Sequence, residues 1–385
     1  MKYFLVIVAF GLIPFGAQSA ELALPKIFKN GEVADADDFN ANFDYLQGVI
    51  AEHAEQLGDV AKNAPWLNRG YGGVSKELEV DCNQDPDALR VAYQANIHER
   101  HLSIRIAGAC IGAIDQVEVV DPEGQVFWSP IQSMNQVLSI HIGNPDEKPR
   151  AKLIPRTMGD ISRVGLVSRF GNGLYLNNLD IEMGADDTWG VLYSRNSNGG
   201  LSDVTVTGHP EGGAGQIGVM VQFGASAYLQ TTITGVDYGV YGNKAGSIRI
   251  LWSDVTASIS AIEMDGGELH LHATAMTAPA ALILADGAQA LGTWQPLSLN
   301  GDLSVNSGSL AKLRNLSITG SISLDSAIVE LSGGGIPADM NSKVSCRGLS
   351  QLEIEGQNIK NNNGNLCLDK AAWNSLINAA FPQGS

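Results

Sequence analysis

The sequence has few basic residues and no tract in which they cluster. It contains 24 Lys and Arg against 41 Asp and Glu, which gives a formal net charge of −17 at pH 7. Proteins that bind nucleic acid or anionic membrane surfaces need basic patches. The composition therefore argues against both partners. It also disfavours polyanionic glycans, unless a cation bridges them or a local basic patch overrides the net charge.

Long apolar runs are absent after the first 20 residues, so the sequence predicts no membrane span. The one apolar run, Phe4–Phe15, follows Lys2 and precedes the small-residue segment Ala17–Ala20. This pattern is typical of a secretory signal peptide over residues 1–20. We therefore expect the chain to be exported and to act outside the cell or at the cell surface, with the periplasm as an alternative.

Cysteine is scarce, and its four residues are Cys82, Cys110, Cys346 and Cys367. An exported chain can form disulfides from such an even number, and three pairings are open. Pairing of sequence neighbours is the simplest, because each bond would then staple one end of the fold. No CxxC spacing occurs, so no metal site is expected. No resident cofactor is expected either; calcium is the one ion left open.

The feature that the sequence does have is a repeat in its second half. Six segments share an apolar residue, then Thr or Asn, then Gly or Ala, and their third residues recur at intervals of 27, 22, 21, 23 and 19: Gly208, Gly235, Ala257, Ala278, Gly301 and Gly320. A second series recurs in step with the first: Gly190-Val191, Gly218-Val219, Gly239-Val240, Ala261-Ile262 and Ala281-Leu282. Short segments rich in Val, Ile and Thr, broken by Gly, favour strands over helices. The repeat predicts an all-β protein, a parallel β-helix whose coils stack on their neighbours.

Ahead of the repeat, residues 21–63 are predicted to form a helical module. Its apolar or semi-apolar residues follow heptad spacing: Phe39, Phe43, Leu46, Ile50, His53, Leu57 and Val60. Such a seam favours an oligomeric coiled coil, with a trimer preferred, made through Phe39, Phe43, Leu46, Ile50 and Leu57. The alternative is a helix that packs one face on its own domain. We assign residues 64–75 to a linker, 76–345 to the β-helix and 346–385 to a C-terminal cap.

The start of the predicted β-helix carries a resemblance to a known family. Leu78–Cys82, a short helix predicted at Pro86–Ala95 with Asp85 as its cap, and Ile104–Cys110 resemble the opening of secreted bacterial right-handed β-helix proteins of the pectate-lyase-like superfamily. In that superfamily, the two cysteines and the helix form the N-terminal cap. The segment Phe28–Phe43 is similar to N-terminal modules of exported, tail-fibre-like proteins.

The resemblance implies that the protein handles extracellular glycans, as the lyases, hydrolases, binding proteins and adhesins of this fold do. The catalytic signatures of the best-known enzymes are missing. The nearest match to a Gly-His-Gly motif is Gly208-His209-Pro210, in which Pro replaces the second Gly. A fold of this kind hosts many functions, so the resemblance does not define an activity.

Alignment of the repeats predicts which side chains point outward, because side chains alternate along a strand. One outward column should contain Met220, Tyr241, Glu263 and Ile283, and the next Gln222, Asn243, Asp265 and Ala285. Lys244 and Arg195 should lie nearby in the turns. Amides and carboxylates bind sugar hydroxyls, and an aromatic ring packs on a sugar ring. We therefore expect a glycan-binding patch that includes Gln222, Tyr241, Asn243 and Lys244.

Glu263 and Asp265 are also the candidate catalytic pair. Residues two apart on a strand are separated by roughly 6.5–7 Å, which suits the acid and base of an inverting glycosidase. Carboxylates that only solvate the strand are the simpler interpretation.

A second face should carry Arg249 and His270 in one column, with Glu268 beside them. We expect these three residues to form a polar surface cluster that contributes to ligand binding. His272 is expected to be turned aside by a bend, so that Glu268, His270 and His272 do not form a metal site.

The sequence therefore favours an exported β-helix protein with a glycan-binding or surface-structural, adhesive role. The alternative is a polysaccharide lyase or glycoside hydrolase of the pectate-lyase-like fold.

Overall fold

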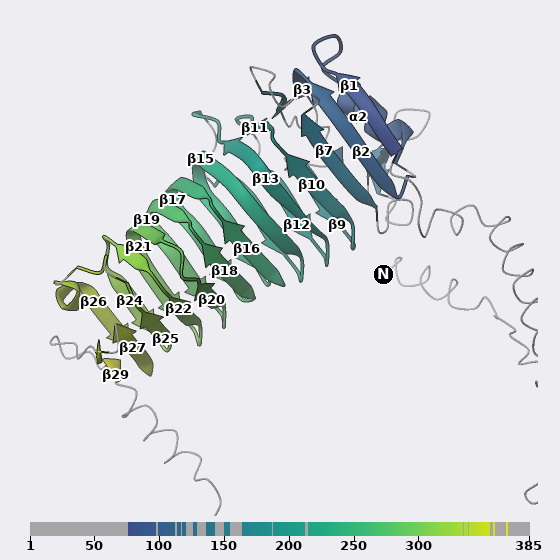
Figure 1. Cartoon of the computed structure of the whole chain (residues 1–385). Helices are drawn as coiled ribbons and strands as arrows, with labels where there is room; N and C mark the ends of the chain where they lie inside the picture. Colours follow the sequence, from purple (N-terminus) through teal and green to yellow (C-terminus); the bar gives the residue numbers. More distant parts are fainter. Residues whose placement is uncertain are drawn as a thin grey trace, which may run out of the picture. The chain divides into compact units, whose positions relative to one another are not determined.

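The computed structural model describes residues 76–97, 99–111, 114–116, 118–120, 126–128, 136–142, 150–154, 164–186, 188–211, 215–333, 335–337, 339–354, 357–358 and 367–368. Within them the chain forms a parallel β-solenoid of about 10 coils, a coil being one full circuit of the chain about the long axis (Figure 1). The predicted all-β, parallel β-helical fold is confirmed. The predicted signal peptide, coiled-coil module, linker and much of the C-terminal cap lie outside the described residues.

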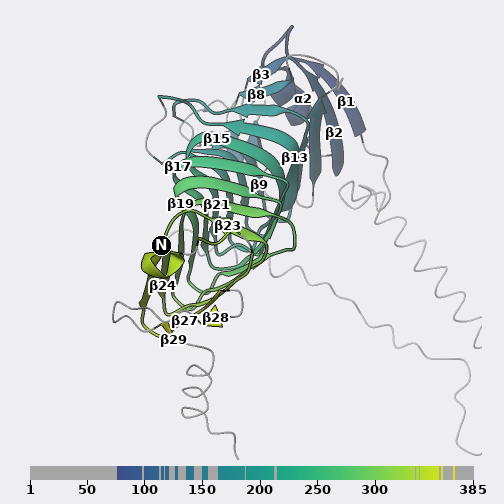
Figure 2. The ribbon, with the colours of Figure 1, turned by 60° about the vertical axis from the view of Figure 1, so that its left-hand side comes forward.

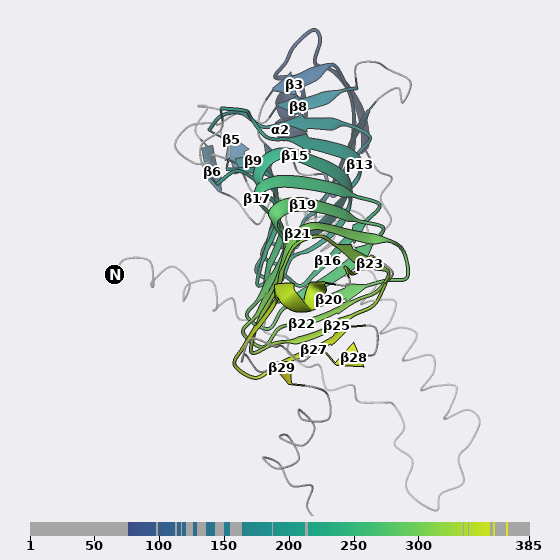
Figure 3. The ribbon, with the colours of Figure 1, turned by 90° about the vertical axis from the view of Figure 1, so that its left-hand side faces the viewer.

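Each coil has three faces, which Figures 2 and 3 show as stacked strands around a common interior. Face 1 contains six short strands: β4 (Ile114–Asp115), β9 (Val164–Arg169), β12 (Trp189–Ser194), β14 (Ile217–Gln222), β24 (Ile322–Asp325) and β26 (Val344–Arg347). Between β14 and β24, this face is formed by the last parts of four longer strands: β15 (Ser226–Asn243), β17 (Asp254–Asp265), β19 (Ala275–Ala285) and β21 (Leu297–Asn306).

Face 2 follows face 1 in each coil. It begins with β1 (Lys76–Asp81), β2 (His101–Ala107), β7 (Val137–Ile142) and β10 (Gly173–Asn177). The first parts of β13 (Asn198–Thr207) and β15 come next. The remaining strands of this face are β16 (Ser247–Leu251), β18 (Glu268–His272), β20 (Gln289–Gly292), β22 (Leu310–Leu313), β25 (Ile328–Leu331), β27 (Ser350–Ile354) and β29 (Cys367–Leu368).

Face 3 completes the coil. It contains β3 (Ala109–Ile111), β8 (Lys152–Ile154), β11 (Asp180–Glu182), the end of β13, the middle of β15, the first parts of β17, β19 and β21, and β23 (Leu316–Ile318). Outside the three faces lie the antiparallel pair β5 (Glu118–Val120) and β6 (Val126–Trp128), the short strand β28 (Gln357–Asn358) and the 3-10 helix η2 (Met340–Lys343).

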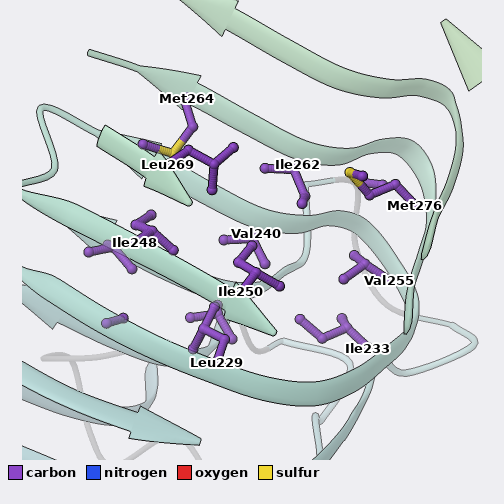
Figure 4. Close-up of a cluster of buried hydrophobic side chains, with 14 of the residues drawn as sticks. Leu229, Ile233, Val240, Ile248, Ile250, Val255, Ile262, Met264, Leu269 and Met276 are labelled. Carbon is purple, nitrogen blue, oxygen red and sulfur yellow. The ribbon is translucent and has the colours of Figure 1, made fainter. Parts of the chain in front are cut away.

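The core is a set of apolar columns that run along the solenoid axis (Figure 4). The side chains that alignment of the repeats predicts to point into the core are all fully buried: Val219, Val221, Val240, Ile262, Met264, Leu282 and Leu284. On face 2, Ile248 and Ile250 pair in register with Leu269 and Leu271 of the next coil, and all four are buried. Each coil thus buries its apolar side chains against its neighbours, which is why a single coil would not fold alone.

Each disulfide joins two cysteines that are consecutive among the four, which is the simplest of the three possible pairings and the one predicted. Cys82 pairs with Cys110 at the N-terminal end, and Cys346 pairs with Cys367 near the other end. The cap helix α2 (Ala88–Ala95) buries Leu89 and Tyr93 against the first coils. It begins at Ala88 rather than at the predicted Pro86, with Asp87 at its N-cap, so the prediction that Asp85 caps the helix is wrong.

No helix within the described residues is long and apolar enough to cross a membrane.

The corner between faces 1 and 2, here corner A, and the corner between faces 2 and 3, here corner B, turn through left-handed residues. Most residues avoid this conformation, because Cβ then crowds the backbone. Corner A places Phe170, Arg195, Phe223 and Lys244 at φ values of 57°, 55°, 53° and 49°. Corner B places Trp252 and Ala273 at 44° and 48°. Bulky side chains thus occupy corner positions where glycine would be less strained.

The column packing predicts a large difference between inward and outward isoleucines. Ile250→Ala removes a fully buried side chain, and we expect it to lower the free energy of unfolding by roughly 2–5 kcal/mol. Ile259→Ala, at a residue that is 44% exposed, should change it by less than about 0.5 kcal/mol. Urea unfolding followed by circular dichroism measures both, and equal midpoints for the two variants would contradict the packing.

Candidate ligand-binding face

The structure aligns both predicted outward columns of face 1. Met220, Tyr241, Glu263 and Ile283 pair in successive coils, as do Gln222, Asn243, Asp265 and Ala285. Lys244 and Arg195 lie at corner A, at the ends of the strands that carry Asn243 and Ser194. The residues predicted for this patch are therefore together, as alignment of the repeats required.

The carboxylates of this patch have unequal environments. Burial, and then the nearby charge of Asp265, raise the pKa of the Glu263 carboxyl above its ordinary value. Burial raises the pKa of Tyr241 as well, with Asp265 and Glu263 adding to the effect, and the Tyr238 ring packs edge-on against it at 6.3 Å. Glu263 is thus the group of this patch suited to hold a proton.

The remainder of face 1 offers less open surface. Val167, Leu192 and Met220 point away from the core, yet all three are buried, and Trp189 and Ile217 pack against them. Met220 points outward, as predicted, but the side chains packed around it cover it. In the column of Met220, Tyr241, Glu263 and Ile283, accessible polar groups therefore begin at Tyr241.

Face 2 carries the second predicted cluster. Arg249 pairs in register with His270, and the same column continues from Tyr228 before them to Leu291 and Lys312 after them. His270 Nε2 lies 3.7 Å from Glu268 Oε2. The predicted column of Arg249 and His270, with Glu268 beside it, is confirmed.

The position expected for His272 is wrong. Strand β18 runs through His272, which therefore lies on the same side of the strand as Glu268 and His270. The bend comes one residue later, at Ala273, whose positive φ of 48° turns the corner. His272 Nδ1 is 2.7 Å from Thr293 Oγ1 of the next coil. Within the described residues, no group of three His, Cys, Asp or Glu side chains could hold a metal ion.

Exposed aromatic side chains gather on face 2 and its two corners, and the sequence analysis did not identify them. The described residues contain five such side chains: Tyr175, Phe223, Tyr228, Trp252 and Trp294. Tyr175 and Tyr228 lie in the column that continues to Arg249 and His270. Phe223 lies at corner A, whereas Trp252 and Trp294 lie at corner B. The signal that could have revealed them is alignment of the turns rather than of the strands.

Polar side chains pack against aromatic rings at both corners, including two of the five exposed rings, Trp252 and Trp294. The Arg195 guanidinium lies 4.8 Å from the centre of the Phe170 ring at corner A. At corner B the Arg314 guanidinium lies 4.4 Å from the centre of the Trp294 ring, and His272 packs edge-on against Trp252 at 4.9 Å. Cation–π and edge-on contacts of this kind fix a ring without covering both of its sides.

Among the grooves on the described surface, three lie beside the corners. One of about 380 Å³ adjoins corner B on face 3, between Asp254 and Ser317. A smaller one of about 200 Å³ lies between Lys312, Arg314 and Glu353 on face 2. Neither Glu263 nor Asp265 lines any of the three.

The third groove, of about 430 Å³, lies at the corner between faces 3 and 1 and is lined by His209, Asp237 and Ser258. Asp237 accepts hydrogen bonds from the Ser258 hydroxyl and, at 2.5 Å, from the Gly215 N–H. These bonds lower the pKa of Asp237. Its carboxylate is therefore engaged in holding Gly215 and Ser258, which gives it a structural role.

No protein-family profile, no curated protein sequence and no solved structure matches this chain. The candidate site therefore rests on its own geometry.

The coupling between the two face 1 carboxylates is testable. Asp265→Asn removes the charge that helps to raise the pKa of Glu263, so we expect that pKa to fall. The folded state holds the Glu263 proton more tightly than the unfolded chain does. The contribution of Glu263 to the free energy of unfolding is therefore lost as pH rises through its folded pKa. Because the pKa is raised less in Asp265→Asn, this variant should lose less free energy of unfolding over the same pH range. Carboxyl ¹³C NMR titration measures the change. With Asp254→Asn as the control, an unchanged Glu263 titration in Asp265→Asn would contradict the coupling.

Proposed function

We propose that this protein binds glycans through face 2 and corners A and B. The observation that carries the proposal is the position of the exposed aromatic rings, all five of which border this one face. Apolar sides of sugar rings pack on aromatic side chains, and exposed Trp and Tyr combine a large apolar body with a polar edge. Arg249, His270 and Glu268 lie among these rings, where they can bind sugar hydroxyls.

The solenoid suits an extended ligand better than a compact one. Successive coils repeat the same outward positions at roughly 4.8 Å, so similar side chains recur along a straight line. A polymer that lies along the axis meets many such positions at once, and weak contacts then add together. Binding along face 2 is the preferred function.

A second candidate function is cleavage of a glycan at Glu263 and Asp265. The raised pKa of Glu263, next to a carboxyl whose spacing on the strand suits an inverting acid–base pair, favours it. The absence of these two residues from the three grooves makes it the weaker of the two candidates.

The proposal includes the setting in which binding occurs. Export through the signal peptide at residues 1–20, a cell-surface or extracellular location, and oligomerisation through the 21–63 module remain part of it. Two disulfides are compatible with an oxidising compartment outside the cytosol. The resemblance to the pectate-lyase-like superfamily supports glycans as the class of ligand, and the tail-fibre-like module suits an adhesive role. A released binding protein and a surface-retained one fit equally well.

Single substitutions on face 2 test the proposal. Tyr228→Ala and Phe223→Gly each remove one exposed ring, and we expect each to weaken binding of a glycan ligand by about tenfold. Phe223 has a positive φ, which glycine adopts without strain, so its replacement should not destabilise the fold. Ile259→Ala, at the corner away from face 2, is the matched control and should bind like the wild type.

The measurement is a glycan screen on the mature chain, followed by titration calorimetry on any glycan that binds. Unchanged affinity in both aromatic variants would overturn face 2 as the binding face. New reducing ends or unsaturated products that disappear in Glu263→Gln would favour the catalytic alternative instead.

A further inference from the structure

We infer that corner B binds a linear, uncharged glycan that lies along the solenoid axis and repeats every two sugars. The inference rests on the proposed function and deepens it, because it specifies the charge, the shape and the direction of the ligand. Trp252, Trp294 and the adjoining groove on face 3 are the residues and the surface that carry it.

The first observation is the spacing of the two tryptophans. Leu251 pairs with His272, and the Trp252 N–H donates to the His272 carbonyl at 2.9 Å, so Trp252 and Ala273 occupy equivalent corner positions. The Thr293 N–H in turn donates to the Leu271 carbonyl at 3.1 Å, which places Trp294 one coil further on. The strands that end at the two tryptophans are therefore two coils apart, or roughly 9.5 Å along the solenoid axis. The disaccharide unit of an extended 1,4-β-linked glycan has a comparable length.

The second observation is the way in which these rings are presented. Trp252 is 58% exposed and Trp294 is 76% exposed, and the corner residue of the coil between them is the small Ala273. This corner is two residues longer than the corner at Ala273: four residues separate Thr293 from Ser298, whereas two separate His272 from Ala275. The extra residues carry Trp294 outward. The Asn315 side-chain amide donates to the Trp294 carbonyl at 2.9 Å and holds this segment in place. The Arg314 guanidinium contacts the Trp294 ring and His272 contacts the Trp252 ring, and these contacts restrain both rings before a ligand arrives, which reduces the entropy lost on binding.

The third observation is the groove of about 380 Å³ that runs beside these rings on face 3. Asp254, Ala275, Ser298 and Ser317 pair in register in successive coils and line it. Their small side chains leave room for a ligand, and the hydroxyls can bind to sugar hydroxyls. A chain that packs on the tryptophans can therefore place its polar edge in this groove.

The charge of the groove selects an uncharged ligand. Asp254 is the one charged residue among those that line it, and none is basic. The Arg314 guanidinium at this corner lies against the Trp294 ring. With a net charge of −17 on the whole chain, a uronate or sulfate group here would be repelled rather than paired.

The two-coil interval recurs elsewhere around face 2. Tyr175 and Tyr228 are two coils apart, and Gly200 occupies the same position in the coil between them. A side chain at Gly200 would be crowded, because its Cβ would lie 2.7 Å from the Tyr228 carbonyl oxygen. Phe170 and Phe223 are likewise two coils apart at corner A, because the residues before them, Arg169 and Gln222, both pair with Ser194. Three aromatic pairs with one interval indicate that the ligand repeats at this interval.

Oligosaccharide titrations with the full mature chain test the inference. We expect binding of 1,4-β-linked cello-, xylo-, manno- or chito-oligosaccharides, with affinity rising steeply once the oligomer spans both tryptophans. Trp252→Gly and Trp294→Ala should each weaken binding by about tenfold. Trp252→Gly should leave the unfolding midpoint unchanged or higher, since it relieves a left-handed residue. Loss of binding in a Trp252→Gly variant that keeps this midpoint would therefore not arise from misfolding.

A relocation variant tests the interval itself. Trp294→Ala combined with Ala273→Trp keeps two tryptophans at corner B but brings them one coil apart. Ala273 has a φ of 48° and Trp252 one of 44°, so the backbone accepts a tryptophan at either residue. We expect the relocated ring not to restore affinity. Ile259→Trp, a new exposed ring away from corner B, is the control for added apolar surface.

The outcomes separate this inference from the proposed function. Glycan binding that depends on Tyr228 and Phe223 but not on either tryptophan would overturn the corner B site alone. Restored affinity in the relocation variant would overturn the two-coil interval. Binding confined to oligogalacturonates or to the curved malto-oligosaccharides would overturn the charge and shape of the ligand. The absence of any glycan binding would overturn the proposed function together with the inference.

Discussion

In-register stacking of apolar side chains is the constraint on which this structure depends. A coil has no core of its own, so Ile248 and Ile250 gain their burial only from Leu269 and Leu271 of the next coil. This requirement fixes the register of every coil against its neighbours. Because strand side chains alternate, fixing the inward residues also fixes the outward ones into straight columns. The regular surface is thus a consequence of the packing.

Outward positions are free of that constraint, and there the chain differs from face to face. Face 1 is apolar and covered at Leu192 and Met220, whereas face 2 and its corners expose aromatic rings, two of which contact His272 and Arg314. Left-handed backbone at corners A and B carries bulky residues that packing does not require there. The proposed glycan-binding role explains both this strained backbone and the exposed rings at a two-coil interval.

Sequence reasoning predicted the strands and the columns because period-two alternation and the recurring Gly-Val positions are local signals. Tyr241 beside Glu263, and Arg249 beside His270, followed directly from them. Corner conformation is less visible in sequence: the bend expected before His272 comes at Ala273, and Trp252 gave no sign of a left-handed turn. Met220 is covered, and burial raises the pKa of Glu263; both effects depend on side-chain packing at the surface, which repeat alignment does not reveal.

The most direct test of the account is a crystal structure of the mature chain with a bound cello-oligosaccharide of six sugars. The account predicts that the oligosaccharide lies parallel to the solenoid axis, with alternate sugars on Trp252 and Trp294 and its polar edge towards Ser298 and Ser317. An oligosaccharide that lies across the coils, or one that binds at Glu263 and Asp265 on face 1, would contradict it.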